Sequence, residues 1–317
     1  MHAVFLDTQT FHSSINFSAI ENCVTQLTCF NTTTPDQLLS RVKDADIIIT
    51  NKVVIDKTTL SQLPQLKLIC ISATGTNNVD LVSARHQGIT VTNVSGYAAP
   101  SLGQYVIAQI LNYFCNLAEH NQVTQRNVWQ QSPTFCVHGS GMSELSSKTL
   151  GIYGYGTLGQ TVGKLAEAFG MKVLVAEHAN AKTIRKGRVS FNDMLSNSDV
   201  VSLHCPQTPN TTELFDKATF EKMKSHALLI NTARGGVVHS QDLADALKQK
   251  LIGHAILDVL DQEPPSPDHP LLDPSLSNVT ITAHMAWASF EAQQRLIALL
   301  AKNIQDFQQN IATNVVN

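Results

Sequence analysis

Residues 149–159 read Thr-Leu-Gly-Ile-Tyr-Gly-Tyr-Gly-Thr-Leu-Gly. The first five residues form an apolar run that predicts a buried strand, and the next six have the pattern Gly-x-Gly-x-x-Gly. Apolar residues then recur at helical spacing, at Leu158, Val162, Leu165 and Phe169. A strand, a glycine-rich turn and a helix in this order are typical of a site that binds the phosphates of a dinucleotide.

The three glycines of this turn have separate physical roles. Gly154 permits the tight turn, Gly156 lets a pyrophosphate approach the backbone, and Gly159 lets the helix pack closely on the strand. We expect the whole turn to contact the cofactor, through Gly154, Tyr155, Gly156, Thr157, Leu158 and Gly159. The alternative interpretation is a glycine-rich turn that binds nothing.

A carboxylate follows at the distance that a nucleotide site requires. The next apolar run, 171–176, ends at Glu177, eighteen residues after Gly159. A carboxylate there can bind both ribose hydroxyls and repel a 2′-phosphate, which favours NAD over NADP as the cofactor. Lys182 and Arg185 lie close behind in the sequence and leave the binding of such a phosphate open.

The alternation of strand and helix patterns continues to residue 282. Six short runs rich in β-branched residues are separated by segments of helical period, and the runs are 150–153, 173–176, 200–205, 228–232, 255–259 and 279–282. This pattern predicts an α/β fold with a doubly wound parallel sheet of the Rossmann type, covered by helices on both faces.

The residues before this region predict a second, smaller α/β unit. Its expected strands are 4–7, 46–50, 68–72 and 89–93. A wide apolar stripe predicts a helix over 100–120, and 121–147 has little periodicity. The last helix is expected over 289–308, and the sequence does not indicate which unit it packs against.

Composition excludes several classes of protein. The chain has 317 residues, of which 43% are hydrophobic and 15% charged, so it can bury a large core and is not disordered. The formal net charge is −3 and no basic run occurs, so we expect no nucleic-acid partner. The longest apolar stretches are too short to cross a bilayer, and the first residues lack a secretory signal. We therefore expect a cytoplasmic protein without a membrane partner.

The cysteines indicate neither a metal site nor a disulfide framework. Six are scattered along the chain with no Cys-x-x-Cys pair, and no cluster of His, Cys and Asp has the spacing of metal ligands. We expect all six to be reduced and most of them to be buried.

Polar residues follow the last three predicted strands of the sheet, where ligands of doubly wound folds bind. They are Arg234, Asp258, Glu263 and His284. This set suits hydride transfer to a 2-keto acid, since the resulting alkoxide needs a proton and an imidazolium can supply it near neutral pH. We assign His284 as the acid/base, Glu263 as its partner, and Arg234 as the group that binds the substrate carboxylate and polarises the carbonyl.

Each of these residues has a structural alternative. Arg234 could satisfy loop carbonyls, Glu263 could be a solvated turn residue, and His284 could be a hydrogen-bonded core histidine. His204 also ends a strand and is the chief competitor as proton donor, but no carboxylate follows it closely. Asp258 is expected to accept a hydrogen bond from the cofactor carboxamide, with a strand-end cap as the alternative.

In this order, the motifs resemble the D-isomer-specific 2-hydroxyacid dehydrogenase family, and the match covers nearly the entire chain. The motifs are 154–159, 232–236, Asp258 with Glu263 and Pro264, and His284 with 286–288, together with 48–52, 73–80 and 91–94. Residues 77–80 and 286–287 are similar to those of the glycerate dehydrogenase (hydroxypyruvate reductase) branch. Ala283, His254 and Gln104 depart from the usual family pattern and leave the substrate open.

The resemblance implies a discontinuous layout and further ligand contacts. Residues 1–99 and 288–317 would form a flavodoxin-like substrate domain, and 100–287 would bind NAD and form a homodimer through an arm at about 100–147. The implied cofactor residues also include His204, Cys205, Pro206, Thr208, Thr232, Ala233 and Asp258. The implied substrate residues are Asn51, the backbone of Thr74, Gly75 and Thr76, which would share the carboxylate with Arg234, and Trp287 as a pocket wall.

The resemblance also implies an activity, the reversible NAD-dependent reduction of a small 2-keto acid to the D-2-hydroxy acid. Hydroxypyruvate or glyoxylate is the first choice of substrate, and another short keto acid such as pyruvate is the alternative. Two other classes of function are alternatives: a non-enzymatic, NAD-sensing binding protein related to corepressors, and a metal-dependent dehydrogenase.

Overall fold

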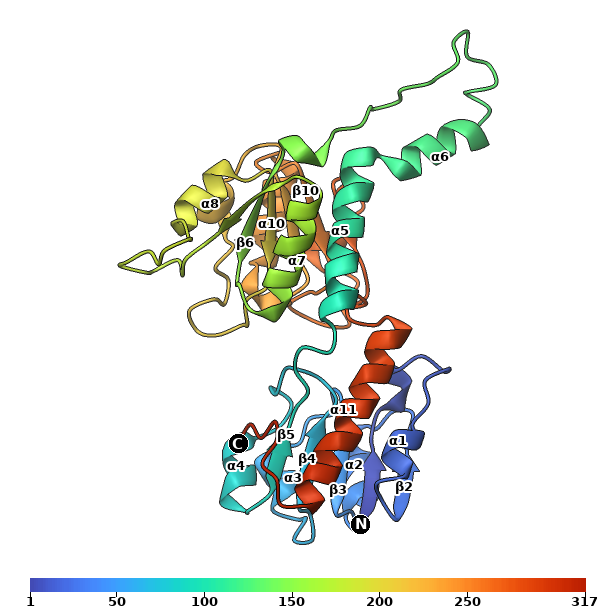
Figure 1. Cartoon of the computed structure of the whole chain (residues 1–317), viewed down its shortest axis with the longest axis vertical. Helices are drawn as coiled ribbons and strands as arrows, with labels where there is room; N and C mark the ends of the chain where they lie inside the picture. Colours follow the sequence, from blue (N-terminus) through green and yellow to red (C-terminus); the bar gives the residue numbers. More distant parts are fainter. The chain divides into compact units, whose positions relative to one another are not determined.

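The computed structural model describes all 317 residues as two compact units, each built on its own parallel sheet (Figure 1). The first unit comprises Met1–Ala98 and Trp287–Asn317, and the second comprises Ala99–Ala286. The chain therefore leaves the first unit once and returns to it for its last helix. The predicted fold class, two α/β units with parallel sheets, is confirmed.

The sheet of the second unit has six strands in the order β11-β10-β9-β8-β6-β7, and all neighbouring pairs are parallel. The strands are β6 (Thr149–Tyr153), β7 (Lys172–Val175), β8 (Val200–Leu203), β9 (Leu228–Asn231), β10 (His254–Leu257) and β11 (Val279–Ile281). These bounds agree with the six predicted runs to within two residues. Short apolar runs that alternate with segments of helical period were therefore a sufficient signal for this sheet.

Helices cover both faces of this sheet because successive strand residues point to opposite sides. On one side, Leu150 and Ile152 of β6 pack with residues of α5 and α7; on the other, Val201 and Leu203 of β8 pack with residues of α8, α9 and α10. The helices of this unit are α5 (Ala99–Cys115), α6 (Leu117–Gln125), α7 (Thr157–Ala168), α8 (Phe191–Asn197), α9 (Lys217–Phe220) and α10 (Ser240–Lys248). Short 3₁₀ turns lie at Leu145–Ser147, Gly235–Val237 and Pro270–Leu272.

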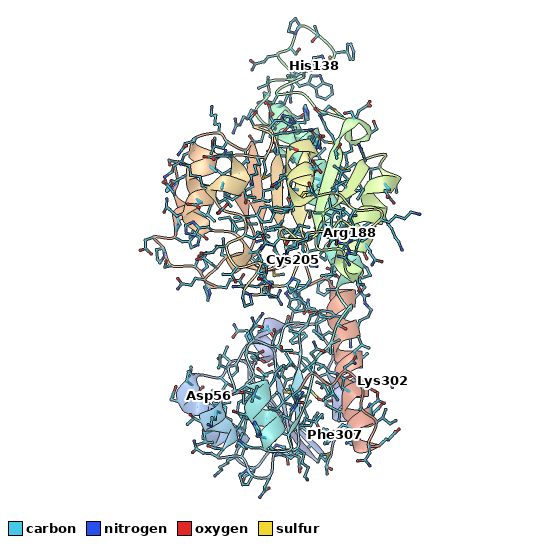
Figure 2. The ribbon with its side chains drawn as sticks, turned by 90° about the vertical axis from the view of Figure 1, so that its left-hand side faces the viewer. Asp56, His138, Arg188, Cys205, Lys302 and Phe307 are labelled. Atoms are coloured by element: carbon cyan, nitrogen blue, oxygen red, sulfur yellow. The ribbon has the colours of Figure 1, made fainter.

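The helix expected over 100–120 is instead two helices. Between α5 and α6, Asn116 has a left-handed backbone with φ 48°, and its side-chain amide donates to the Gly141 carbonyl. The second helix extends to Gln125, beyond the predicted end. The segment from α6 to about residue 144 projects from the body of the second unit, and His138 lies on it (Figures 1 and 2). It exposes large apolar side chains, among them Leu117, Trp129, Phe135 and Met142.

The sheet of the first unit has the order β2-β1-β3-β4-β5, which is the strand order of flavodoxin-like folds. Its strands are β1 (His2–Phe5), β2 (Gln26–Cys29), β3 (Ile47–Thr50), β4 (Leu68–Ile71) and β5 (Thr90–Thr92). The sequence did not predict β2. This strand lies at the sheet edge with no fully buried residue, so its polar sequence Gln-Leu-Thr-Cys gives no buried-strand signal.

The last helix, α11 (Phe290–Gln308), belongs to the first unit. Ser289 caps it by accepting a hydrogen bond from the Ala292 N–H, and Leu296, Leu300 and Ile304 are completely buried in a cluster with β1, β3 and β4. Lys302 and Phe307 mark this helix in Figure 2. The other helices of the unit are α1 (Ser18–Glu21), α2 (Pro35–Val42), α3 (Lys57–Leu60) and α4 (Leu81–His86), with a 3₁₀ turn at Thr8–Thr10.

The cysteines are all free, but the expectation that most are buried is wrong. Only Cys70 and Cys205 are buried, Cys29 is exposed, and Cys23, Cys115 and Cys136 are partly buried. The scattered sequence positions gave no information on burial, since three of these residues lie near helix ends or on the projecting segment. No helix of the protein is both long and apolar enough to span a bilayer.

Candidate active site

The glycine-rich turn lies where the strand order of the second sheet reverses. After β6 the chain continues to the outer strand β7 and then crosses to β8 on the other side of β6. Gly154 has φ 95°, and a Cβ added to it would lie 2.5 Å from the Cys205 nitrogen, so only glycine fits. The turns after β6 and β8 therefore touch, which is the crevice where doubly wound sheets bind ligands.

The residues around this crevice fit a dinucleotide. A Cβ added to Gly156 would meet no atom within 4 Å, so the backbone of α7's first turn is open to an approaching phosphate. The Thr232 hydroxyl and the His204 Nδ1 are buried without a hydrogen-bond partner. Buried polar atoms of this kind normally have partners, and both residues were predicted to contact the cofactor. A Cβ on Gly159 would overlap the Gly154 carbonyl, as the helix-packing role of this glycine requires.

Glu177 follows β7 and is already bound to an arginine. Arg185 donates from Nε to Oε2 and from Nη2 to Oε1 of Glu177, both at 2.6 Å. The His178 N–H also donates to Oε1, at 3.0 Å. The Arg185 hydrogen bonds hold the pKa of the Glu177 carboxyl well below its usual value, so this group is an anion at neutral pH. Sequence reasoning placed Arg185 near a possible phosphate but missed its pairing with Glu177.

The loops that follow β8, β9 and β10 contact one another through glycines. A Cβ on Gly235 would overlap the backbone of Leu260 and Asp261, and a Cβ on Gly236 would overlap the Gln207 side chain. The loop that carries Arg234 is therefore packed between the loops that follow β8 and β10. Arg234 is the residue next to Gly235, and Leu260 and Asp261 lie shortly before Glu263 in the sequence. The contact of Gly235 with these two residues therefore brings the loops of Arg234 and Glu263 together.

His284 and Glu263 form a hydrogen-bonded pair. The His284 Nδ1 lies 2.7 Å from the Glu263 Oε2, and the side chains are 29% and 35% exposed. The other carboxylate oxygen accepts the Leu260 N–H at 3.0 Å. Glu263 is thus fixed by its own loop, and its contact with Nδ1 leaves the His284 Nε2 on the far side of the ring. The structure joins these two predicted residues, which are 21 positions apart in the sequence.

Asp258 holds the backbone around His284. Its carboxylate accepts the Met285 and Ala286 N–H groups, each at 2.8 Å, and the Thr282 hydroxyl at 2.6 Å. Burial raises the pKa of this carboxyl, although the hydrogen bonds oppose the change. The geometry favours the alternative that the sequence left open, a structural carboxylate at a strand end, without preventing a further contact with a ligand.

Arg234 is partly buried at the end of β9. Its Nη1 donates to the Ala233 carbonyl at 2.6 Å, which leaves its other N–H groups for a ligand. The Asn231 side chain braces the loop from within, since it accepts the Ala233 N–H at 3.0 Å and donates to the Arg234 carbonyl at 2.9 Å. The sequence gave no reason to single out Asn231, which is completely buried.

His204 is a poor competitor as proton donor. Its Nε2 lies 2.9 Å from the Ser202 hydroxyl, and burial lowers the pKa of the imidazole to about 4. The ring is therefore neutral near pH 7. Cys205 follows it as a buried thiol whose pKa burial raises to about 11. In the same loop, the Thr211 hydroxyl accepts the Thr208 N–H at 2.7 Å and donates to the Pro206 carbonyl at 2.7 Å, so this hydroxyl links both ends of the turn after β8.

The predicted substrate residues all lie on the first unit. Asn51 follows β3, and its N–H donates to the Asp7 carboxylate at 2.9 Å. The Thr74 hydroxyl donates to the Val94 carbonyl at 3.0 Å, and Gly75 and Thr76 continue the same loop after β4. Trp287 packs edge-on against Phe11 and Tyr97, with ring centroids 6.0 and 6.1 Å away. Asp7, which also accepts the Lys52 and Val53 N–H groups, was not predicted.

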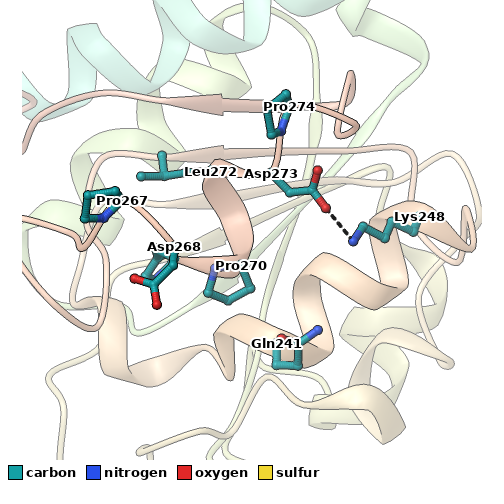
Figure 3. A pocket seen from close by; sticks show the side chains of 9 residues that line it. Gln241, Lys248, Pro267, Asp268, Pro270, Leu272, Asp273 and Pro274 are labelled. Atoms are coloured by element: carbon teal, nitrogen blue, oxygen red, sulfur yellow. Dashed lines mark ion pairs between the residues drawn. The ribbon is translucent and has the colours of Figure 1, made fainter.

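A separate surface cavity of about 410 Å³ contains none of the predicted residues (Figure 3). It is lined by α10 and the proline-rich segment 267–274, and the Lys248–Asp273 ion pair of 2.7 Å crosses its edge. It therefore plays no part in the site described here.

Comparisons with known proteins identify the same region. The family described as "D-isomer specific 2-hydroxyacid dehydrogenase, NAD binding domain" matches residues 107–286. The chain is 40% identical over 286 residues to the glycerate dehydrogenase of Methylorubrum extorquens, covering 90% of each protein. It is 36% identical over 285 residues to the hydroxypyruvate reductase of Blautia hydrogenotrophica, covering 89% of this chain and 88% of that protein.

A solved structure is similar to the whole chain, including the first unit. An acyclic imino acid reductase in complex with NADPH and D-Arg superimposes with a TM-score of 0.85 and 27% identity, over 100% of both chains. The family match lies within the second unit and includes the glycine-rich turn, Arg234, Glu263 and His284. The chain therefore belongs to the D-isomer-specific 2-hydroxyacid dehydrogenases and is an NAD-dependent enzyme of that family.

Proposed function

We propose that this enzyme reversibly reduces a small 2-keto acid, hydroxypyruvate or glyoxylate in the first place, to the corresponding D-2-hydroxy acid. The observation that carries the proposal is the 2.7 Å contact between His284 Nδ1 and Glu263 Oε2, in loops at the same sheet edge as the glycine-rich turn. Such a pair is suited to deliver a proton from Nε2 to an alkoxide. The names of the two curated relatives, a glycerate dehydrogenase and a hydroxypyruvate reductase, support the substrate class.

The proposed roles follow from the chemistry of the side chains. When bound, NADH supplies the hydride that reduces the carbonyl carbon. His284 donates the proton, and Glu263 stabilises the imidazolium and fixes the ring plane. Arg234 binds the substrate carboxylate and polarises the carbonyl with its positive charge. Asn51, the loop of Thr74 to Thr76, and Trp287 stay predictions as substrate contacts.

The glycine-rich turn, Glu177 and the turn after β8 are the proposed holders of the cofactor. The phosphates would meet the N–H groups that start α7, and the adenosine ribose would meet Glu177. The buried Thr232 hydroxyl and His204 Nδ1 would gain partners, which supports the assignment of both residues to this role.

The substrate is tested by a steady-state panel of NADH oxidation with hydroxypyruvate, glyoxylate, pyruvate and bulkier keto acids. We expect the highest kcat/KM with hydroxypyruvate or glyoxylate. A clear preference for pyruvate would replace the substrate assignment but keep the reaction class. No turnover with any 2-keto acid, in a protein that binds NADH, would instead favour an NAD-sensing binding protein.

We further propose that the enzyme is a homodimer and resides in the cytoplasm. The segment 117–144 exposes Phe135 to 90% and Met142 to 70%, and exposed apolar surface of this kind favours association with a second copy. Six free thiols favour a reducing compartment. Analytical ultracentrifugation should give the mass of two chains, and a Phe135→Ser, Met142→Ser variant should shift it toward one chain; cell fractionation tests the location.

A further inference from the structure

The carboxylate predicted to bind the cofactor ribose is covered by a side chain of the protein itself. Glu177 is only 3% exposed, whereas the Arg185 side chain that lies on it is 59% exposed. Arg185 uses two of its nitrogens, one on each carboxylate oxygen. The Arg185 guanidinium therefore lies between the Glu177 carboxylate and the solvent.

The hydrogen-bonding capacity of Glu177 is largely used. Oε1 accepts from Arg185 Nη2 and from the His178 N–H. Oε2 accepts from Arg185 Nε and, at 3.4 Å, from the Arg185 N–H, while Arg188 Nε lies 3.9 Å away. A carboxylate offers about four lone-pair positions, so two ribose hydroxyls bind only where the Arg185 guanidinium has been displaced.

The surroundings of Arg185 allow such a displacement. The loop from His178 to Gly187 is mostly exposed, and Lys182, Arg185 and Lys186 all extend from it. Arg188 is held separately, because its Nη1 donates to the Ala176 carbonyl at 3.0 Å. An Arg185 that leaves Glu177 still belongs to this exposed loop, and a guanidinium is well suited to pair with a phosphate group.

We propose that Arg185 sets the nucleotide specificity of this enzyme by competing with the cofactor ribose for Glu177. It weakens the binding of NADH, which has to displace it, and supports the binding of NADPH, whose 2′-phosphate it can pair with. The inference rests on the proposed cofactor role of Glu177, and it predicts that removal of Arg185 changes the two affinities in opposite directions.

Calorimetric titration of the full-length protein with NADH and NADPH, without keto acid, tests this directly. In Arg185→Met, which keeps the apolar stem, the Kd for NADH should fall about three- to tenfold, because the ion pair between Arg185 and Glu177 no longer competes with the ribose. The Kd for NADPH should rise about tenfold or more, because the phosphate loses its bidentate partner. Arg185→Lys should show a smaller change for NADPH, since the charge stays but the planar fork is lost.

Lys186→Met is the matched control, because Lys186 is an exposed cation of the same loop and is not among the groups that contact Glu177. It should leave the Kd for NADH unchanged. If Arg185→Met leaves both affinities unchanged, or weakens both together, Arg185 is a structural partner of Glu177 and the inference is wrong. If the unmodified protein binds neither nucleotide, the proposed function itself fails, which is a different outcome.

Discussion

His284 has a left-handed backbone, with φ 55°, which residues other than glycine adopt at a cost in free energy. Hydrogen bonds hold this conformation. The His284 N–H donates to the Asp258 carbonyl at 2.9 Å, and the Asp258 carboxylate accepts the next two N–H groups. Asp258 therefore fixes the backbone of the loop that carries His284, and in this conformation the imidazole contacts Glu263.

Replacement of Glu263 by Gln tests the role of the charge. The amide keeps the size of the side chain and can still contact Nδ1, but it no longer stabilises an imidazolium. We expect kcat for keto-acid reduction to fall about ten- to a hundredfold with little change in KM, because His284 becomes a less effective general acid while the binding of the substrate is unchanged. Gln262→Ala, at the exposed neighbouring position, is the control; an unchanged kcat in Glu263→Gln would remove Glu263 from the mechanism.

Arg234 allows a second test at this scale. Arg234→Gln removes both the charge and the fork, and we expect kcat/KM to fall at least a hundredfold, since an electrostatic contact to the reacting group is lost. Arg234→Lys should recover part of this loss because the charge returns without the bidentate geometry. Equal losses in both variants, measured by steady-state kinetics, would indicate that Arg234 only supports the loop.

His204 predicts a pH dependence of stability. Burial lowers the pKa of its imidazole from 6.5 to about 4. Between these values the unfolded chain binds the proton and the folded protein does not, so the free energy of unfolding falls as the pH drops from about 6.5 to 4, by about 3 kcal/mol in total. Urea denaturation of His204→Gln, which can still contact Ser202, should lose less stability between pH 7.5 and pH 5 than the unmodified protein. An identical loss in both proteins would contradict the assignment.

Among the secondary-structure elements, α5 is connected to the catalytic loop by a chain of hydroxyls. The Tyr105 hydroxyl lies 2.6 Å from the Thr282 Oγ1, and the Thr282 hydroxyl donates to the Asp258 carboxylate at 2.6 Å. Thr282 therefore donates to Asp258 and accepts from Tyr105. The sequence placed Tyr105 on a helix with an apolar stripe and gave no indication of this contact.

Tyr105→Phe breaks the chain at its outer end without changing the shape of the side chain. We expect kcat to fall about three- to tenfold at unchanged KM for NADH, because Asp258 and the loop of His284 lose part of their support, a hydrogen bond worth about 1 kcal/mol. Tyr113→Phe, on the same helix, is the matched control. A change in KM alone, or an equal change in the control, would show that Tyr105 only stabilises α5.

The predicted and the missed strands and helices show which sequence patterns indicate secondary structure in this chain. The strands of the second sheet were predicted because they lie in short apolar runs rich in β-branched residues, such as Val-Val-Ser-Leu in β8. The edge strand β2, with the sequence Gln-Leu-Thr-Cys, was missed because it lacks such a run. The break at Asn116 was missed because the apolar stripe continues across it. The candidate site residues at strand ends were predicted together from their positions in the sequence. The supporting contacts of Asn231 and Asp7, and the pairing of Arg185 with Glu177, were not predicted because the spacing of residues in the sequence does not give distances between side chains.

For the whole molecule, the chain returns to the first unit after residue 286, and its end completes the sheet begun by the first hundred residues. Val315 forms a bridge to Thr92, the Val316 N–H donates to the Val91 carbonyl, and the Asn317 side chain contacts both Val91 and Ile89. The tail thus covers the open edge of β5, which would otherwise expose unpaired backbone groups.

Removal of residues 315–317 should therefore destabilise the first unit. The three hydrogen bonds to Ile89 and Val91 are lost, at about 1 kcal/mol each, and the uncovered edge can pair with another chain. We expect a lower Tm and concentration-dependent aggregation, measured by calorimetry and light scattering, with Asn317→Ala as an intermediate case that keeps the backbone contacts. An unchanged Tm and no aggregation would show that the tail is dispensable.

The contact of Gly235 with Leu260 and Asp261 has a consequence for attempts to evolve this enzyme toward new substrates. Randomising the codon for position 235 should yield mostly inactive clones, since any side chain there would overlap the backbone of Leu260 and Asp261 and separate the loop of Arg234 from the loop of Glu263. A mutagenesis library should leave this codon untouched and place its diversity elsewhere.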